Sequence, residues 1–551
     1  MSVRDDMRTW DAETIILIGA IVLGAGGSGI VWVGARLWSW QSGRAAPANP
    51  LAVVLALVRG DLPGSVLLWS LPGAVLVALI VFGAATIGAR RGRARRGDRA
   101  ARLAGSGKDI QTLTRQAAAA KAQRLHVPGP VSGLPIGRSV AGNVELESSF
   151  EDVGVNISGP RTGKTTCWVV PRIFAAPCAV VATSNKRDIV DATRARRAAR
   201  GRVWVFDPQS ICDEVQSWWW NPLRQVTNAV EAKDLANVFV DSTRAANAAT
   251  NAYFDGAARD VVTALLLAGG RGGKTLRDVW RWVTDPDDRE PLRILERTGE
   301  HMVYQSLSAN MSLVAETRSG VYGSAGQILS FLLNEEALAW VEPHGTEFKP
   351  EEFVASLDTL YCLSQEGKGS AAPIVTALTV AVVQAALLHA KAQPNGRVSI
   401  PMLIELDEAA NVCRWRDLPD LYSHFGSRGI CVDTILQSWS QGAHAWGEAG
   451  IRKLWSASNV KVYGGGVSER DFLAQLSDLI GVHYVDSRSM STSAQGRSTS
   501  TSRESQQRPI ATVADLQALP AGRAWVFASG TPALLAALIP FWEREKEVTP
   551  S

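Results

Sequence analysis

Residues 154–166 read GVNISGPRTGKTT, in which a short apolar run, GVNI, leads into a glycine-rich turn and then into a helical pattern. This order of strand, turn and helix is typical of a P-loop, whose backbone N–H groups surround phosphate oxygens at the positive end of a helix. We expect Lys164 to reach the β and γ phosphates and the Thr165 hydroxyl to ligate Mg²⁺. The nucleotide-binding residues predicted from the turn are Ser158, Gly159, Pro160, Arg161, Thr162, Gly163, Lys164, Thr165 and Thr166.

Two features complicate this assignment. Ser158 stands where the usual pattern has its first glycine, and we expect the neighbouring Gly159 to supply the backbone freedom. A second stretch, AGGRGGKT at 268–275, has the same spacing, but it follows a helical pattern rather than a strand. Thr275 and Asp278 form a capping-box pattern for the next helix. We therefore interpret this second stretch as a turn between two helices.

An acidic pair follows another apolar run. Hydrolysis of ATP needs an acidic partner for Mg²⁺ and a group that activates water. The run 402–406, MLIEL, ends at Asp407 and Glu408, and we expect Asp407 to face the metal and Glu408 to polarise the attacking water. Glu405, inside the strand, has no explanation from the sequence. A rival run at 203–208, VWVFDP, lacks the second acid.

Two further residues flank the apolar run 432–436. Gln437 follows it, and in P-loop motors a polar residue on the strand beside the acidic one senses the γ phosphate. Arg428 precedes it, and is either an arginine finger that reaches the phosphate of a neighbouring subunit or an ordinary surface arginine. The candidate catalytic residues are thus Glu408, Gln437 and Arg428, and the candidate metal ligands are Thr165 and Asp407.

From residue 151 onward, short apolar runs alternate with helical patterns, which is typical of βαβ units and a mostly parallel sheet. Between 225 and 345 helical patterns dominate, and residues 487–508, rich in Ser, Thr, Arg and Gln, are expected to form a flexible loop. The predicted strands are Val153–Ile157, Ala179–Thr183, Val203–Phe206, Thr359–Leu363, Met402–Leu406, Cys431–Leu436, Val460–Tyr463 and Ala524–Phe527.

The 551 residues exceed the size of an ordinary single domain. The predicted fold class is an α/β P-loop NTPase, RecA-like and with a mostly parallel sheet, that carries an inserted all-helical domain and two N-terminal transmembrane helices. We expect a membrane anchor at 1–89, a basic juxtamembrane linker at 90–150, a nucleotide-binding domain in two parts at 151–224 and 346–551, and the helical insertion at 225–345.

Two uncharged runs near the N-terminus, 15–35 and 66–89, are each long enough to cross a bilayer as a helix. Buried core helices are the alternative, but such helices rarely stay apolar on all sides over this length. The first run does not resemble a signal peptide, because it is too long and acidic residues precede it. We therefore expect a multi-pass protein of the inner or cell membrane.

Seven arginines lie between residues 90 and 102, directly after the second apolar run. Basic residues mark the cytoplasmic side, so the remaining chain is expected in the cytoplasm, and two spans return the N-terminus there as well. We interpret the arginines as a topology signal that contacts anionic membrane lipids. Nucleic-acid binding and a solvated linker are the alternatives.

Charge and cysteine content exclude some classes of function. The formal net charge of +4 is nearly balanced for this length, so it does not indicate a nucleic-acid-binding protein. The six cysteines form no CxxC pair and have no histidine cluster nearby, so no structural zinc site is expected. A basic cluster either lines a DNA channel or is a solvated helix face; it consists of Arg194, Arg196, Arg197 and Arg200.

The ordered set of motifs resembles the type IV coupling proteins of conjugation, the TraG/TraD-like ATPases. The resemblance rests on two N-terminal spans followed by GPRTGKTT, LIELDEAANV and ILQSWSQ. Smaller matches are TSNKRDIV with Lys186, VFDP, WNPL and the segment 458–481. The usual Asp-Pro before the lysine is replaced by Ser184 and Asn185. The similarity is scattered over most of 150–545.

This resemblance implies a membrane-anchored hexameric ATPase, whose ring surrounds a central channel and hydrolyses ATP with Mg²⁺ between subunits. The implied cargo is single-stranded DNA bound to a relaxase. The implied partners are the relaxosome and the type IV secretion channel proteins, and the helical insertion would help to receive the cargo. Carried over by position, the active site would consist of Lys164, Thr165, Asp407, Glu408 and Gln437.

Other functions stay open at this point. A protein-secretion ATPase of the same architecture would need no DNA, and the sequence does not decide between the two cargoes. A scaffold that binds nucleotide without hydrolysis and gates a membrane complex is a further reading, against which Asp407 and Glu408 argue. Chromosome-segregation translocases of the FtsK type usually act on duplex DNA and carry more membrane spans.

Overall fold

The computed structural model describes residues 29–63, 98–129, 131–243, 251–367, 371–492 and 499–548. The chain divides into two compact units, Met1–Arg96 and Gly97–Ser551. In the first unit, residues 29–42 are helical and a second helix, α3, spans Pro50–Val58. Ala35 and Val53 are fully buried between them, and the indole N–H of Trp32 donates to the Ala48 carbonyl at 3.0 Å.

The expected membrane spans fall mostly outside the described residues. This holds for 15–28 and for the whole of 66–89, whereas 29–35 belong to the first helix. Among the described residues, one helix is long and apolar enough to cross a bilayer, α16 at Ala372–Ala392. Because 78% of its apolar window is buried within the second unit, α16 is a core helix there.

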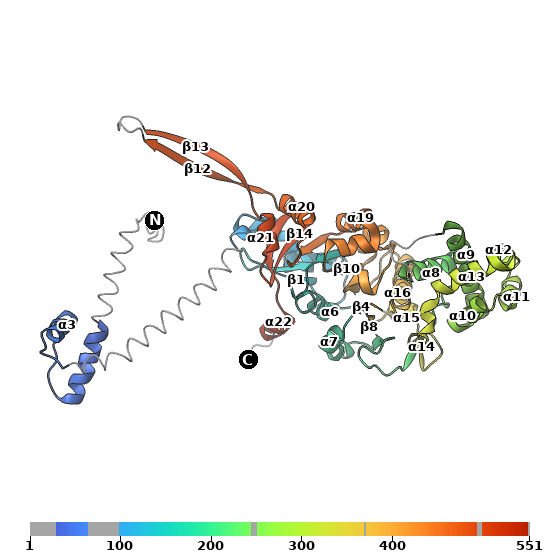
Figure 1. The fold of residues 1–551 in the computed structure, drawn as a ribbon, viewed down its shortest axis with the longest axis horizontal. Helices are drawn as coiled ribbons and strands as arrows, with labels where there is room; N and C mark the ends of the chain where they lie inside the picture. Colours follow the sequence, from blue (N-terminus) through green and yellow to red (C-terminus); the bar gives the residue numbers. More distant parts are fainter. Residues whose placement is uncertain are drawn as a thin grey trace. The chain divides into compact units, whose positions relative to one another are not determined.

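The second unit is built on a sheet of eleven strands in the order β2-β1-β15-β14-β11-β3-β10-β9-β4-β8-β5 (Figure 1). The strands from β11 to β5 in this order run parallel. They are short apolar runs, mostly buried on both faces, as parallel strands require. They span β3 Gly154–Ile157, β4 Val180–Ser184, β5 Val203–Phe206, β8 Thr359–Leu363, β9 Met402–Leu406, β10 Ile430–Leu436 and β11 Val460–Tyr463. The predicted mostly parallel sheet is confirmed.

Helices cover both faces of this sheet. On one face, α6 (Val170–Ala175) and α7 (Asp188–Ala198) pack through a cluster that includes Ile173, Ile189 and Leu403. The other face is covered by α16, α18 (Leu418–Arg428) and α19 (Trp439–Ala457). The sheet is therefore the middle of three layers.

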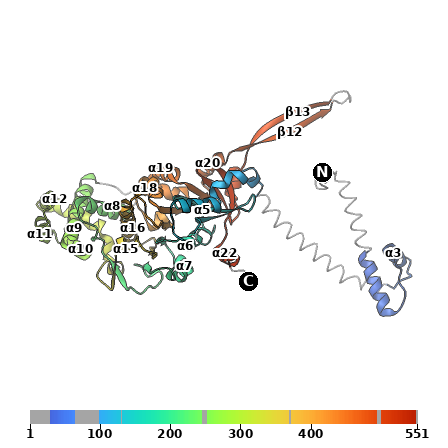
Figure 2. The ribbon, with the colours of Figure 1, turned by 180° about the vertical axis from the view of Figure 1, so that it is seen from behind.

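Four antiparallel strands extend the sheet beyond β11. They are β14 (Arg523–Ala528), β15 (Thr531–Ala537), β1 (Leu134–Ser139) and β2 (Glu145–Ser148). The last two come from the stretch expected to be a linker, which also holds α5 (Arg115–Arg124; Figure 2). Part of that stretch is thus integral to the sheet, because β1 pairs with β15, Arg138 opposite Ala537, far along the chain.

The described residues between β6 (Trp218–Trp220) and β7 (Thr346–Phe348) form helices and their connections and contain no strand, and β6 and β7 pair with each other at the base of the helices. Aromatic rings of Trp204, Trp218, Trp340 and Phe348 meet at this base with centroids 5.1–5.4 Å apart. The helices are α8 Ala229–Thr243, α9 Ala252–Gly272, α10 Leu276–Thr284, α11 Glu290–Arg297, α12 His301–Met311, α13 Ala315–Ile328 and α14 Glu335–Ala339.

A long β-hairpin replaces the flexible loop expected at 487–508. Strands β12 (Val482–Thr492) and β13 (Thr499–Pro509) pair antiparallel, from Val482 opposite Pro509 to Thr492 opposite Thr499. Figures 1 and 2 show the hairpin leaving the unit at the end opposite to α8–α14. The expectation of a loop was wrong, because a Ser- and Thr-rich hairpin with no apolar alternation gives no strand pattern. The remaining helices are α15 Pro350–Phe353, α17 Ala409–Val412, α20 Arg470–Ile480, α21 Val513–Gln517 and α22 Phe541–Val548.

Candidate nucleotide-binding site

The glycine-rich turn 158–166 joins β3 to a short π-helical turn, Lys164–Val169, which continues into α6. Arg161 and Gly163 have positive φ angles of 59° and 88°, so two residues of the turn have left-handed backbone. Pro160 and Arg161 are exposed, whereas Ser158 and Gly159 are buried. The Thr162 hydroxyl donates to the Gly159 carbonyl at 2.8 Å, and the Thr166 hydroxyl to the Gly163 carbonyl at 3.4 Å.

The order β3-β10-β9 brings three segments to one edge of the sheet, because carboxyl ends of parallel strands meet there. Lys164 follows β3, Gln437 follows β10, and Asp407 with Glu408 follows β9. The Thr165 hydroxyl donates to Asp407 Oδ2 at 3.4 Å. The residues that we predicted from separate motifs therefore lie together.

Lys164 is folded back onto its own loop. Its Nζ donates to the carbonyl oxygens of Ser158 at 2.9 Å and Gly159 at 3.0 Å. Burial lowers the pKa of Lys164, and the Lys186 charge lowers it further, while Glu408 and Asp407 oppose the shift. Lys186 thus lies near the phosphate edge; the sequence indicated it only through the family resemblance.

Glu408 and Gln437 form a direct pair. Gln437 Nε2 donates to Glu408 Oε1 at 2.6 Å, and Glu408 has a left-handed backbone, with φ 54° and ψ 41°. The Gln437 backbone N–H donates to Gln441 Oε1 at 2.8 Å, and Gln441 Nε2 donates to Asn411 Oδ1 at 3.0 Å. This chain of amides fixes Glu408 at the site; Gln441 and Asn411 were not among the predicted residues.

Oxygen donors suited to Mg²⁺ are present. Mg²⁺ prefers hard oxygen ligands and usually takes one or two from the protein, with phosphate and water supplying the rest. Thr165 and Asp407 fit this pattern, and no group of three or more His, Cys, Asp and Glu side chains that could hold another metal occurs among the described residues. Burial and the nearby Glu408 carboxylate raise the pKa of Asp407 to about 7, while Lys164 opposes this.

Arg428 lies away from this edge. It is the last residue of α18, just before β10 begins, so it stands at the opposite end of that strand from Gln437. Its Nη1 donates to the Gly396 carbonyl at 3.0 Å. Arg428 therefore has no contact with the phosphate edge of its own chain, and a finger role requires a neighbouring subunit.

The rival motifs have structural roles. Stretch 268–275 closes α9 with Gly273 at φ 63° and opens α10 through the capping box of Thr275 and Asp278, so its prediction as a helix–helix turn is confirmed. Asp207, at the end of the edge strand β5, accepts the backbone N–H groups of Ile211 and Cys212, both at 2.7 Å. Its carboxylate organises a turn.

The basic cluster on α7 and just after it makes contacts within the protein. Arg194 makes two 2.7 Å bonds to Glu214, and Arg196 stacks on the Phe174 ring. Arg197 is buried and donates to several carbonyls, and Arg200 donates to the Ala176 carbonyl at 2.6 Å. These contacts give the cluster a structural explanation.

Glu405 belongs to a buried ionic cluster. Arg172 of α6 donates through Nε to Glu405 Oε1 at 3.0 Å, and its other nitrogens contact Asp433 and, at 3.1 Å, the Ser148 hydroxyl. Arg172, Glu405 and Asp433 are 0–2% exposed. Burial, together with the neighbouring Asp433 carboxylate, raises the pKa of Glu405. The cluster ties the helix that follows the P-loop to the strands of Asp407 and Gln437.

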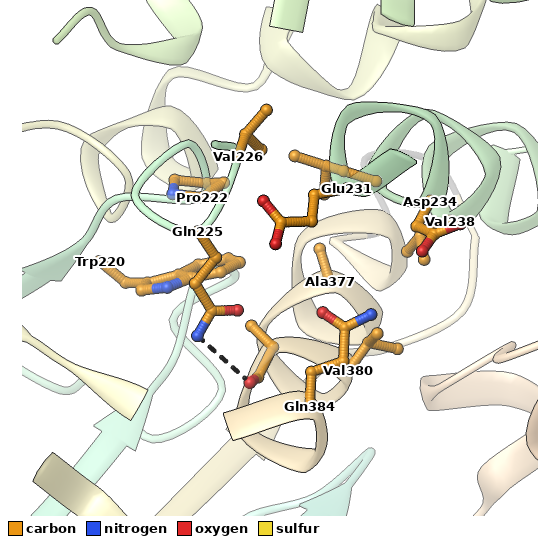
Figure 3. Close-up of a pocket in the computed structure, with 12 residues that line it drawn as sticks. Trp220, Pro222, Gln225, Val226, Glu231, Asp234, Val238, Ala377, Val380 and Gln384 are labelled. Carbon is orange, nitrogen blue, oxygen red and sulfur yellow. Dashed lines mark hydrogen bonds between the residues drawn. The ribbon is translucent and has the colours of Figure 1, made fainter. Parts of the chain in front are cut away.

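A small apolar pocket lies elsewhere, where α8 meets α16 (Figure 3). Trp220 and Val380 line it, and Gln225 Nε2 donates to the Ala381 carbonyl at 3.5 Å. Glu231 points toward it, but its carboxylate already accepts the Thr227 N–H and hydroxyl. The pocket shares no residue with the phosphate edge, so it is not part of the candidate nucleotide site.

Comparison with known proteins agrees with the motifs. A family model described as the TraM recognition site of TraD and TraG matches residues 401–521. The conjugal transfer protein TraG of Rhizobium radiobacter is 24% identical over 394 residues, which cover 69% of this chain and 60% of the relative. TraG of Agrobacterium fabrum is also 24% identical, covering 69% and 59%. The match therefore spans about 60% of the length of these curated relatives.

Solved structures show the same fold. The unbound coupling protein TrwBdeltaN70 matches with a TM-score of 0.55 and 18% identity, covering 77% of this chain and 91% of its own. TrwB in complex with ADP and Mg²⁺ matches with a TM-score of 0.52 and 17% identity, covering 77% and 92%. The expected α/β P-loop fold is confirmed, and so is the expected resemblance to this family.

Proposed function

We propose that this chain, a relative of the type IV coupling proteins of conjugation, is a membrane-anchored ATPase that couples ATP hydrolysis to the transfer of DNA into a secretion channel. The observation that carries the proposal is the meeting of Lys164, Thr165, Asp407, Glu408 and Gln437 at one edge of the parallel sheet. TrwB, which shares the fold, has been solved with ADP and Mg²⁺. This supports ATP and Mg²⁺ as the cofactors here.

Each residue has a role that its surroundings favour. The backbone N–H groups of 161–166 bind phosphate, and Lys164 exchanges its two loop carbonyls for phosphate oxygens. Thr165 and Asp407 would hold Mg²⁺, which supplies charge neutralisation when bound. Glu408 accepts a proton from the attacking water. Gln437 holds Glu408 in place and reports whether the γ phosphate is present.

The proposed wider assembly rests on the resemblance to this family. We propose two N-terminal membrane spans at 15–35 and 66–89, a cytoplasmic ATPase unit, lipid contact by the arginines of 90–102, and a hexameric ring. The cargo is single-stranded DNA with its relaxase, delivered to type IV secretion channel proteins. The family model over 401–521, described as a TraM recognition site, supports a relaxosome partner.

The decisive experiment measures ATP turnover by the full chain in nanodiscs of anionic lipid, with and without single-stranded DNA. Turnover that rises with DNA and disappears in Lys164→Ala and Glu408→Gln supports the proposal. Turnover that ignores DNA would instead indicate a protein cargo. Absence of turnover in assembled rings would contradict an ATPase and leave a nucleotide-binding scaffold.

Arg428 is tested in the same assembly. As a finger in trans, Arg428→Ala lowers turnover by about 100-fold or more but leaves nucleotide affinity unchanged. Unchanged turnover in assembled rings would make Arg428 an ordinary surface arginine.

A further inference from the structure

A glycine loop within segment 458–481, to which the sequence assigned no role, packs against the P-loop turn. Residues Gly464–Gly466 follow β11, the strand beside β3. The Gly159 N–H donates to the Gly465 carbonyl at 2.8 Å, and the Gly464 N–H donates to the Ser158 hydroxyl at 3.0 Å. This explains the serine in the first position of the turn: its hydroxyl binds the neighbouring loop.

The two loops touch backbone to backbone. A Cβ added at Gly159 would lie 2.1 Å from the Gly466 carbonyl oxygen. A Cβ added at Gly466, where φ is 74°, would lie 3.1 Å from both Gly159 Cα and Thr162 Cγ2. Gly159 is therefore required by this close approach, rather than by the conformational freedom that the sequence suggested.

The other end of the same loop reaches the Gln437 side of the site. Glu469 accepts the backbone N–H groups of Trp439 and Ser440, both at 2.9 Å. These are the first residues of α19, directly after Gln437 and Ser438. Residues 464–469 thus contact the P-loop through glycine backbone and the γ-phosphate sensor segment through one carboxylate.

We propose that residues 464–469 are positioning residues that hold the P-loop turn and the Gln437 segment at a fixed separation, so that phosphate binding and water activation occur in one geometry. This inference rests on the nucleotide site proposed above. A displacement of about 1 Å at such a site costs about 100-fold in rate, which is why a rigid link between its two walls matters. Glycine backbone provides that link without side-chain freedom.

The test compares matched variants of the full chain in nanodiscs. Gly466→Ala is paired with Gly530→Ala, because both glycines have φ 74° but Gly530 has no atom near its added Cβ. Binding of a fluorescent ADP analogue is expected to weaken by about tenfold in Gly466→Ala only. Equal affinity in the two variants overturns the proposal.

The second arm tests Glu469→Gln. Its control is Asp278→Asn, which replaces one carboxylate oxygen in the helix cap of α10, remote from the site. Glu469→Gln is expected to lower kcat about tenfold with KM unchanged, whereas Asp278→Asn affects melting temperature alone. A Glu469→Gln effect confined to melting temperature overturns the proposal. Should Gly466→Ala fail to fold, this arm decides.

The binding arm also separates the two proposals. If the wild-type chain binds the analogue but shows no turnover, the proposed ATPase function is contradicted. The Gly466→Ala and Gly530→Ala pair then still tests the positioning role of residues 464–469. If Gly466→Ala and Glu469→Gln both retain the wild-type turnover, the positioning role of residues 464–469 is contradicted and the proposed ATPase function is supported.

Discussion

The two glycine-rich stretches 158–165 and 268–275 have the same spacing and both end in Lys-Thr, yet they have different roles in the fold. The first follows β3, the middle strand of the eleven-stranded sheet, where Thr165 contacts Asp407 and Gln437 contacts Glu408. The second ends α9 and begins α10 among helices. A glycine-rich turn is a candidate phosphate site because a strand precedes it and acidic residues lie beside it; its own sequence motif is not sufficient.

The lysines give the largest expected contrast. Lys164→Ala is expected to reduce ATP turnover by about 1,000-fold, because it removes the cation that the P-loop turn itself places at the phosphate edge. Lys274 instead pairs with Glu290 at 2.7 Å, and their side chains are 31% and 26% exposed. Lys274→Ala should cost only about 0.5 kcal/mol of stability and leave turnover unchanged. A loss of turnover in Lys274→Ala would contradict the assignment of the two turns; steady-state assays on both variants decide.

The helix after the first turn, α6, is anchored to the sheet by the buried ion pairs of Arg172, and a substitution of Arg172 tests their contribution to stability. Arg172→Met leaves Glu405 and Asp433 buried without a cation, and is expected to cost about 3 kcal/mol or more of unfolding free energy. Replacing Glu405 by Gln and Asp433 by Asn in the same variant removes the uncompensated charge, so most of the melting temperature should return. Calorimetry checks this; a triple variant no more stable than Arg172→Met would show that the charges are not the cause.

The next largest effect is expected at Glu408, the proposed water-activating carboxylate beside the first turn. Glu408→Gln is expected to lower turnover by about 100-fold, because a neutral amide cannot take the proton of the attacking water. Nucleotide affinity should remain, since the Gln437 bond still finds an amide oxygen. Turnover and analogue binding measured on one preparation separate the two effects. Equal turnover in wild type and variant would remove Glu408 from the mechanism.

The sequence could predict the parallel strands, since each is a short apolar run buried in place: β5, β8, β9 and β11 have the predicted bounds. Of the antiparallel extension only β14 was predicted, as Ala524–Phe527. The strand β1, LPIGRS, could not be predicted, because it contains Pro and Gly and pairs with β15 far along the chain. Glu405 remained unexplained for the same reason, as its partner Arg172 lies 233 residues away. Local pattern thus predicts elements and motif residues, whereas the contacts that fix them arise from distant segments.

The threonines give the smallest contrast. Thr275→Ala removes a capping box and its 3.1 Å bond to Glu342, and is expected to cost about 1 kcal/mol of unfolding free energy with turnover unchanged. Thr165→Ala is expected to do the reverse. Its hydroxyl makes a long 3.4 Å contact to Asp407, so stability should change by only about 0.5 kcal/mol while Mg²⁺-dependent turnover falls. Chemical denaturation and Mg²⁺ titration of turnover, run on both variants, measure the two quantities. If Thr165→Ala destabilised the chain as much as Thr275→Ala and left turnover intact, Thr165 would be a helix cap like its counterpart, and the proposed metal site would lose one of its two ligands.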